Sequence, residues 1–336
     1  MTGTAEWLER RRNGIGGSDV AAILGLSPYA GPFDVWMEKL GKREADEGET
    51  EGEKKQKNRG NVLEPAVANW YAAELDCAVA AIPQAMLPLR GEASWMTGSP
   101  DRMAIPSTLW DLSIEEVLES NEAWGMEAKT ARSLDGWGES GTDIIPVYYM
   151  TQCVWYMAIT KKARWDLAVY FPFYDDFRWY TIKRDLSTEN AIVKRVTEWR
   201  ERHIVGQEMP EIDGSEGAAK YLIDTYRVPR LPDRDATSEE VSLALELRDV
   251  RRTLDSAKER YELLSTQMKA SIGEYRGVRH PDFGSILWSP VAGRATAKMK
   301  DLEKKHPAIY EQLLGEGIIN IGKPSRQFRP SFGKEE

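Results

Sequence analysis

The chain has 336 residues, of which 41% are hydrophobic and 29% are charged, and its formal net charge is -9 at pH 7. This length is enough for one catalytic domain with a smaller appended part. No apolar run approaches the length of a membrane span, and the first residues lack the apolar core of a signal peptide, so we expect a cytoplasmic protein.

The cysteines and histidines exclude several kinds of site. Cys77 and Cys153 are far apart and flanked by apolar residues, which is typical of core thiols rather than of a disulfide or a metal pair. The three histidines are scattered. Carboxylates are therefore the only metal ligands present in quantity, and a zinc hydrolase is not expected.

The acidic net charge argues against a general attraction of nucleic acid to the whole surface. The charge is unevenly distributed, however, because six acids fall within residues 44–53 and five within residues 111–122. Both segments are predicted to be surface insertions. Basic residues gather at 10–12 and at 323–329, so a nucleic-acid enzyme is not excluded.

The N-terminal part is predicted to be helical. A short helix over 6–12 is followed by Gly16-Gly17-Ser18-Asp19 and an apolar run, which predict a helix start whose free N–H groups and Ser18 hydroxyl suit a phosphate. The alternative is that Ser18 is an ordinary N-cap. Further helices are expected over 32–40 and 58–74, on either side of a charged loop over 42–57.

Glu64 lies in the expected 58–74 helix, directly before Pro65. A lone glutamate on a helix is usually solvated. Because the neighbours of Glu64 on the helix are apolar, it is a candidate for an acid that points into the fold.

Two strand segments carry the main chemical signal, with Asp101 after Pro100 on the first and Glu127 and Lys129 on the second. Alternate residues of a strand share a face, so Glu127 and Lys129 point the same way and Asp101 completes the cluster. Two close carboxylates repel each other unless a divalent cation lies between them, and oxygen ligands favour Mg²⁺ or Mn²⁺. Lys129 would orient a water or steady the phosphate; the alternative is an edge-strand ion pair.

A polar, glycine-rich loop over 130–145 is expected to be able to close over a substrate, and Pro146 begins the next helix. Tyr148, Gln152 and Tyr156 are four residues apart and share a face of this helix. A buried aromatic seam explains the tyrosines but not Gln152, since a buried amide needs partners such as an active-site metal or water.

The remaining pattern predicts a hairpin over 164–183, an amphipathic helix over 187–204, and a long helix over 237–274 with a coiled-coil-like apolar stripe. Short strands and helices follow. We therefore expect a catalytic domain over 1–204, a linker over 205–236 and an accessory region over 237–336. The long helix is expected to serve either packing or oligomerisation.

Taken together, these motifs resemble the YqaJ-type viral recombinase family, whose members are relatives of lambda exonuclease with the PD-(D/E)xK nuclease fold. In chain order the motifs are Trp7-Leu8-x-x-Arg11, Ile15-Gly-Gly-Ser18-Asp19, Arg59-Gly60-x-x-x-Glu64, Ser99-Pro-Asp101, Glu127-x-Lys129 and Gln152-x-x-x-Tyr156. The Ile-Gly-Gly-Ser-Asp element makes the resemblance much more specific than the acid and lysine pattern does.

The resemblance implies an α/β (α+β) fold with a PD-(D/E)xK restriction-endonuclease-like core. In it a mixed central sheet is flanked by helices and followed by a C-terminal long helix and a small strand-containing extension. It also implies a Mg²⁺-dependent DNA exonuclease, with Mn²⁺ as a substitute, that acts 5′→3′ on duplex ends and generates single strands for phage-type homologous recombination. Double-stranded DNA ends, a single-strand annealing recombinase and further copies of the chain would be its partners, in a bacterial or phage-infected cell.

The resemblance also assigns roles to single residues. Asp101, Glu127 and Glu64 would be metal ligands, Gln152 would complete the metal and water shell, Lys129 would position or activate the water, and Arg11, Ser18 and Ser99 would bind the 5′-phosphate. Arg132 is the nearest candidate for a second phosphate-binding arginine. An endonuclease or nickase of the same fold, or a non-catalytic DNA-binding assembly protein, is the alternative.

Overall fold

The computed structural model describes residues 12–42, 51–280, 283–290 and 298–321. The chain forms two compact units, Met1–Leu222 and Ile223–Glu336. In the described part of the chain, every helix is too short or too polar to cross a membrane.

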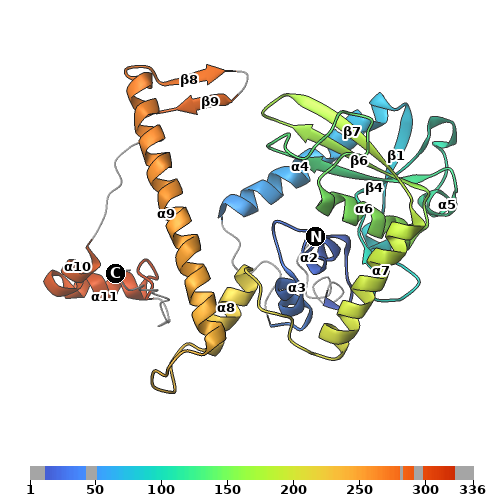
Figure 1. Ribbon diagram of the computed structural model, residues 1–336. Helices are drawn as coiled ribbons and strands as arrows, with labels where there is room; N and C mark the ends of the chain where they lie inside the picture. The colour runs from blue at the N-terminus through green and yellow to red at the C-terminus, as the bar shows by residue number, and fades with distance from the viewer. Residues whose placement is uncertain (1–11, 43–50, 281–282, 291–297, 322–336) are drawn as a thin grey trace. The chain divides into compact units, whose positions relative to one another are not determined.

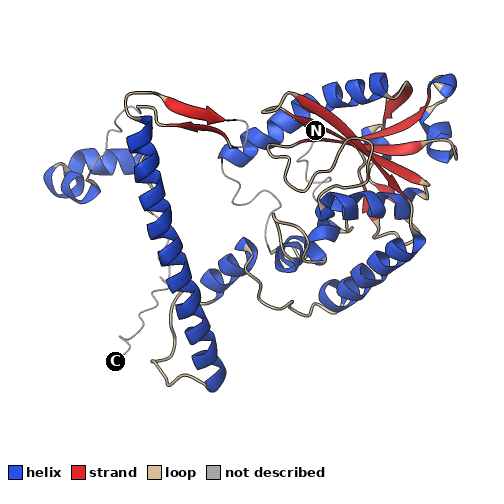
Figure 2. Ribbon diagram, turned by 45° about the horizontal axis from the view of Figure 1, so that its top comes forward, coloured by secondary structure: helices blue, strands red, loops and turns tan. Residues whose placement is uncertain are grey.

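The first unit is built on a five-stranded sheet with the strand order β1-β4-β5-β6-β7, shown in Figures 1 and 2. The strands are β1 (Cys77–Ala81), β4 (Arg102–Pro106), β5 (Trp124–Thr130), β6 (Arg164–Phe171) and β7 (Asp176–Lys183). Neighbouring strands are antiparallel except for β5 and β6, which are parallel. A parallel pair needs a crossover, and helix α6 (Val147–Thr160) provides it.

Helices cover both faces of this sheet, so the expected mixed sheet flanked by helices is confirmed. On one face, Met126 and Ala128 of β5 pack with Val67 and Tyr71 of helix α4 (Glu51–Glu74). On the other face, Leu167 of β6 belongs to the larger core that includes α6 and α7 (Leu186–Arg200). The alternation of side chains along β5 therefore places Glu127 and Lys129 on the α6 face.

Helix α4 begins earlier than expected. Residues 51–57 were expected in a charged loop, but they form the first two turns of the helix, because lysine, glutamate and glutamine favour helical backbone even without an apolar face. Residues 43–50 lie outside the described part of the chain. The remaining elements of the first unit are α2 (Gly17–Ile23), α3 (Pro32–Lys39), α5 (Ile114–Glu119), the short strands β2 (Leu89–Arg90) and β3 (Thr97–Gly98), and the single turns η1 (Gln84–Met86), η2 (Ser107–Leu109) and η3 (Glu201–Val205).

The segment expected as a linker, residues 205–236, contains helix α8 (Glu216–Thr225). The ring of Tyr221 packs against Phe33 and Trp36 of α3 at centroid distances of 5.4 and 6.0 Å. The backbone N–H of Gly217 donates to Asp34 at 2.9 Å. Part of this segment is thus packed into the first unit. The Pro- and Gly-containing sequence of the segment does not predict these contacts.

The loop over 130–145, expected to be able to close over a substrate, is tied to β7. Arg178 and Tyr180 donate to the carbonyl of Gly138 at 2.9 and 2.8 Å. Trp137 packs between Tyr149 of α6 and Tyr180 of β7. These contacts hold the loop against the edge of the sheet.

The second unit contains the expected long helix and strand-containing extension. Helix α9 (Ser238–Ile272) begins at a capping box between Thr237 and Glu240 and ends at Gly273, whose φ of 53° is the left-handed conformation that glycine adopts easily. The antiparallel hairpin of β8 (Gly277–His280) and β9 (Gly284–Leu287) follows, and then α10 (Met299–Lys305) and α11 (Pro307–Gly315).

Candidate active site

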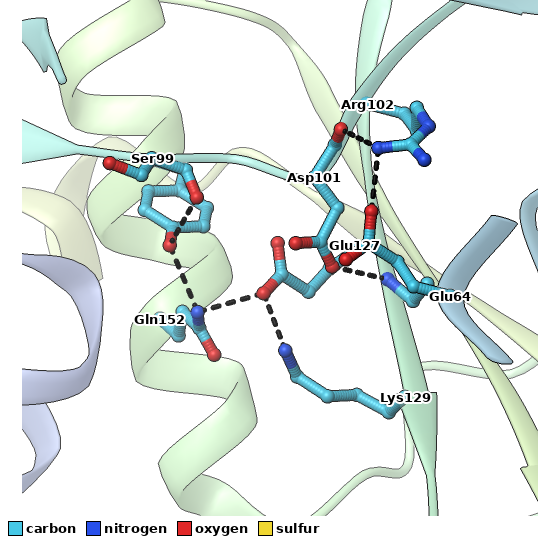
Figure 3. Close-up of polar contacts among 9 residues, drawn as sticks. Glu64, Ser99, Asp101, Arg102, Glu127, Lys129 and Gln152 are labelled. Carbon is cyan, nitrogen blue, oxygen red and sulfur yellow. Dashed lines mark hydrogen bonds and ion pairs between the residues drawn. The ribbon is translucent and has the colours of Figure 1, made fainter. Parts of the chain in front are cut away.

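The pairing of β4 with β5 brings the acid and lysine motifs together. Arg102 of β4 lies opposite Met126 of β5, so Asp101, just before β4, reaches the part of β5 that carries Glu127. The backbone N–H of Ala128 donates to Oδ2 of Asp101 at 2.9 Å. This bond fixes Asp101 beside Glu127 and Lys129. Figure 3 shows the carboxylate of Asp101 beside that of Glu127.

Glu127 is only 2% exposed, and its two oxygens have different surroundings. Its Oε1 accepts from Lys129 Nζ at 2.5 Å and from Gln152 Nε2 at 2.9 Å. Its Oε2 is buried and has no hydrogen-bond partner. A buried carboxylate oxygen without a partner is costly, so this atom is where a ligand would be expected.

Gln152 has the inward orientation that its sequence context suggested. Besides Glu127, its amide donates to the hydroxyl of Tyr156 at 2.9 Å, and Tyr156 donates to the carbonyl of Ser99 at 3.4 Å. The partners of this buried amide are therefore a carboxylate and a phenol. These hydrogen bonds link helix α6 to Glu127 of β5 and to Ser99, which lies shortly before β4.

Burial and charge repulsion together raise the pKa of Glu127 to about 7, and the neighbouring charge of Asp101 is the second cause after burial. Burial by itself would lower the pKa of Lys129, but the charges of Glu127 and Asp101 outweigh it and raise that pKa above its ordinary value. Lys129 is therefore an ammonium at neutral pH. The cluster combines a glutamate that resists ionisation with a fixed cation beside it.

Glu64 approaches the cluster from α4 but is held by an arginine. Arg102 donates to Glu64 Oε1 at 2.6 Å and to the carbonyl of Asp101 at 2.6 Å. Burial, followed by the charge of Asp101, raises the pKa of Glu64. The sequence analysis missed Arg102, although a basic residue directly after a site acid is a usable signal for a partner to a second acid.

The carboxylates fit a divalent cation held by two of them. In the described part of the chain, no three acidic, histidine or cysteine side chains lie together as a complete metal-binding group. Mg²⁺ does not require one, because it keeps several waters and is commonly held by one or two carboxylates with substrate phosphate oxygens. Asp101 and the partnerless Oε2 of Glu127 fit this role, whereas Glu64 would first have to leave Arg102.

A cavity of about 230 Å³ adjoins the cluster, and both candidate phosphate-binding serines, Ser18 and Ser99, line it. Tyr156 lines it as well, so one residue contacts the cavity and, through Gln152, the acidic cluster. Arg11 lies outside the described residues. Arg132 is exposed on the loop that follows β5.

The cavity wall also contains a buried ion pair that the sequence analysis missed. Lys39 Nζ lies 2.6 Å from Asp19 Oδ2, and both residues are buried. Asp19 also accepts the backbone N–H of Gly16 at 2.9 Å, so Gly16 is the N-cap of α2 and Ser18 is not. A lysine at the end of an amphipathic helix normally faces solvent, and no local pattern distinguishes Lys39 from that case.

Gly17 explains part of the Gly-Gly signature. A Cβ at this position would lie 2.9 Å from Gln152 Cγ and 2.9 Å from Tyr156 Cε1. The missing side chain therefore lets α2 approach α6 closely. Gly17 thus lets the helix that lines the cavity pack against Gln152 and Tyr156, which contact the acidic cluster.

A mixed sheet whose adjacent strands carry Asp101 and the Glu127-x-Lys129 motif defines the PD-(D/E)xK class of folds. Residues 6–163 match the family model of the YqaJ-like viral recombinase domain. The match covers just under half of the chain and confirms the resemblance that the motifs indicated.

Several individual proteins are similar to the chain. The uncharacterized protein YqaJ of Bacillus subtilis (strain 168) is 26% identical in an alignment over 323 residues that covers 92% of this chain and 90% of that protein, so the similarity extends into the second unit. The alkaline exonuclease LHK-Exo of Laribacter hongkongensis aligns with a TM-score of 0.43 and 18% identity over 60% of this chain and 94% of its own. A phage-related exonuclease of Haemophilus somnus 129PT aligns with a TM-score of 0.38 and 13% identity, over 58% of this chain and 96% of its own.

Proposed function

We propose that this chain is a metal-dependent deoxyribonuclease that digests DNA 5′→3′ from duplex ends and supplies single strands for phage-type homologous recombination. The observation that carries the proposal is the acidic cluster with its partnerless Glu127 Oε2, which Gln152 and Tyr156 connect to a cavity lined by Ser18 and Ser99. The family's description as a viral recombinase domain supports DNA as the substrate.

Asp101 and Glu127 would hold Mg²⁺, with Mn²⁺ as a substitute. When bound, the cation supplies positive charge to the phosphate and lowers the pKa of a coordinated water. Lys129 and Gln152 both bind Glu127 Oε1, which keeps that carboxylate in place and turns Oε2 toward the ligand. Because Lys129 is protonated, its role is to steady negative charge and orient the attacking water rather than to remove a proton.

The cavity would receive the 5′-phosphate of a DNA end. A terminal phosphate carries a negative charge that an internal phosphodiester lacks, so charge-assisted hydrogen bonds can discriminate between them. Ser18 and Ser99 would donate to it, and the ammonium of Lys39, whose charge is offset by Asp19, lies in the same wall. Arg11 would add a further cation, as the family resemblance implies.

Cleavage of linear duplexes with 5′-phosphate or 5′-hydroxyl ends, compared with closed circular DNA, tests this proposal. We expect rapid, Mg²⁺-dependent digestion of the phosphorylated duplex, slower initiation on the hydroxyl end, and no attack on the circle. Rapid attack on the circle would favour the endonuclease or nickase alternative. Binding without cleavage in Mg²⁺ or Mn²⁺ would favour the non-catalytic assembly protein.

We further propose that the protein acts as a homo-oligomer that cooperates with a single-strand annealing recombinase. An acidic chain attracts DNA poorly from a distance, so enclosing the duplex between copies is a better way to retain it. Light scattering at micromolar concentration tests the oligomer. A monomer with full processive activity would contradict it.

A further inference from the structure

Helix α9 carries an exposed apolar stripe with coiled-coil spacing, and we propose that it pairs in parallel and in register with α9 of a second copy of this chain. The proposal concerns the second unit alone. It does not depend on the nuclease function, because none of its residues belongs to the candidate active site.

The spacing of the stripe is regular over nearly four heptads. Successive members are four and three residues apart in strict alternation, which is the 3.5-residue period of two helices wound around each other. The stripe consists of Leu243, Leu247, Val250, Leu254, Ala257, Tyr261, Leu264 and Met268. A charged residue at any of these positions would break the pattern, and none is present.

These side chains are exposed, except for Met268, which is half-buried. Leu243 is 67% exposed, Leu254 59% and Tyr261 72%. A continuous row of large apolar side chains in water is unfavourable, and in soluble proteins such a row marks an interaction surface.

The partner must be another long helix with the same period. At about 1.5 Å per residue the stripe is roughly 38 Å long. Within the described part of the second unit, the other helices are α10 with 7 residues and α11 with 9, so each could cover only about a third of it or less. A second α9 matches the stripe in length and period.

The charges that flank the stripe favour a parallel arrangement. In a parallel, in-register pair, the residue directly before the core position Leu247 faces the residue five places later on the other helix. Glu246 would then face Arg251 of the second copy, and the two-fold symmetry would make this pair twice. An antiparallel arrangement would instead set Arg251 and Lys258 on facing edges, where their like charges repel. The existing contact of Arg251 with Asp255 at 3.1 Å is exposed and therefore weak enough to exchange.

Adjacent cysteine substitutions test the register. Leu264 lies on the stripe and Leu263 does not, yet the two are 47% and 49% exposed. In the full-length protein treated with a copper–phenanthroline oxidant, we expect L264C to form a disulfide-linked dimer, because core positions of a parallel pair lie within disulfide reach. L263C should stay monomeric on a non-reducing gel. Cys77 and Cys153 remain in both variants and give the same background. Equal crosslinking of both variants, crosslinking of neither, or crosslinking of L263C alone would overturn the proposal.

A second pair of variants tests the affinity. Leu247→Asp with Leu254→Asp places charges in the proposed interface, whereas Leu245→Asp with Leu263→Asp places the same residues on exposed positions off the stripe. We expect self-association on the order of a hundredfold weaker or more in the first variant, because each aspartate would be buried without a partner. The second should associate like the wild type, with the same helix content by circular dichroism. Equal masses of both variants across a dilution series would also overturn the proposal.

Discussion

The two faces of the central sheet each bury an acid, and the two acids differ in how completely they are bound. Asp166 on the α4 face is fully buried and accepts from Tyr71 and from Arg164 Nε at 2.9 Å and Nη2 at 2.5 Å. Tyr71 in turn accepts from Trp124 Nε1 at 2.7 Å. Glu127 on the α6 face keeps one oxygen with no partner at all.

The two acids are neighbours in the sheet, since Asp166 lies opposite Met126 and Glu127 opposite Leu167. Strand alternation alone sends them to opposite faces. A buried polar network with every group satisfied stabilises a unique packing, whereas an incomplete one has a place for a ligand. From this comparison we expect Asp166 to stabilise the fold and Glu127 to take part in the proposed reaction.

The largest expected difference between Glu127 and Asp166 is in their effect on DNA cleavage. Glu127→Gln keeps the shape of the side chain but removes the charge that would hold the cation, so cleavage should fall on the order of a thousandfold or more. Lys129→Ala should act in the same direction. Removal of divalent cations with EDTA should abolish wild-type cleavage reversibly. Gel assays on an end-labelled duplex measure all three, and activity that persists in EDTA would break the assignment.

The next effect is on stability. Asp166→Ala leaves the guanidinium of Arg164 and the hydroxyl of Tyr71 without their partner, so we expect a loss of about 3–5 kcal/mol in the free energy of unfolding. Urea denaturation measures this loss, with Glu127→Gln as the matched control that should unfold close to the wild type. The folded fraction of Asp166→Ala should still cleave DNA. An inactive but fully stable variant would reverse the roles of the two acids.

The pH dependence should come from Glu127. Its pKa is raised from 4.5 to about 7 on folding, so between these pH values the folded state binds more protons than the unfolded state. The contribution of this group to stability in EDTA should therefore be fully present below pH 4.5 and be lost as the pH rises through 7, by at most about 3 kcal/mol. Glu127→Gln should remove this component from a series of urea titrations. An identical slope in both proteins would show that Glu127 is not the group.

The smallest effect concerns the cavity. Ser18→Ala and Ser99→Ala should each weaken the preference for a 5′-phosphate over a 5′-hydroxyl by about 0.5–1.5 kcal/mol, because each removes one hydrogen bond to the terminal phosphate. Initial rates on the two linear duplexes give this ratio directly. Ser187→Ala, on the exposed first turn of α7, is the control that should leave the ratio unchanged. A preference that survives the double variant would remove the serines from the pocket.

Sequence patterns predicted the features that depend on local order. Strand alternation gave the common face of Glu127 and Lys129, helical spacing gave the inward Gln152, and the apolar stripe gave α9. The pairs Arg102–Glu64 and Lys39–Asp19 were not predicted, because each joins elements that are distant in sequence and each residue alone resembles a solvated surface charge. The attachment of the loop over 130–145 was not predicted either, since it depends on Arg178 and Tyr180 of a later strand.

The close contact of α2 with α6 at Gly17 has a consequence for the size of the product. Gln152 and Tyr156 support the acidic cluster, and the same tyrosine forms part of the cavity wall. In the proposed function, the place where a DNA end is held and the place where the bond is cut therefore share one rigid wall. The distance from the bound DNA end to the cleaved bond would then be fixed. Every turnover should release a fragment of the same length, whatever the base sequence.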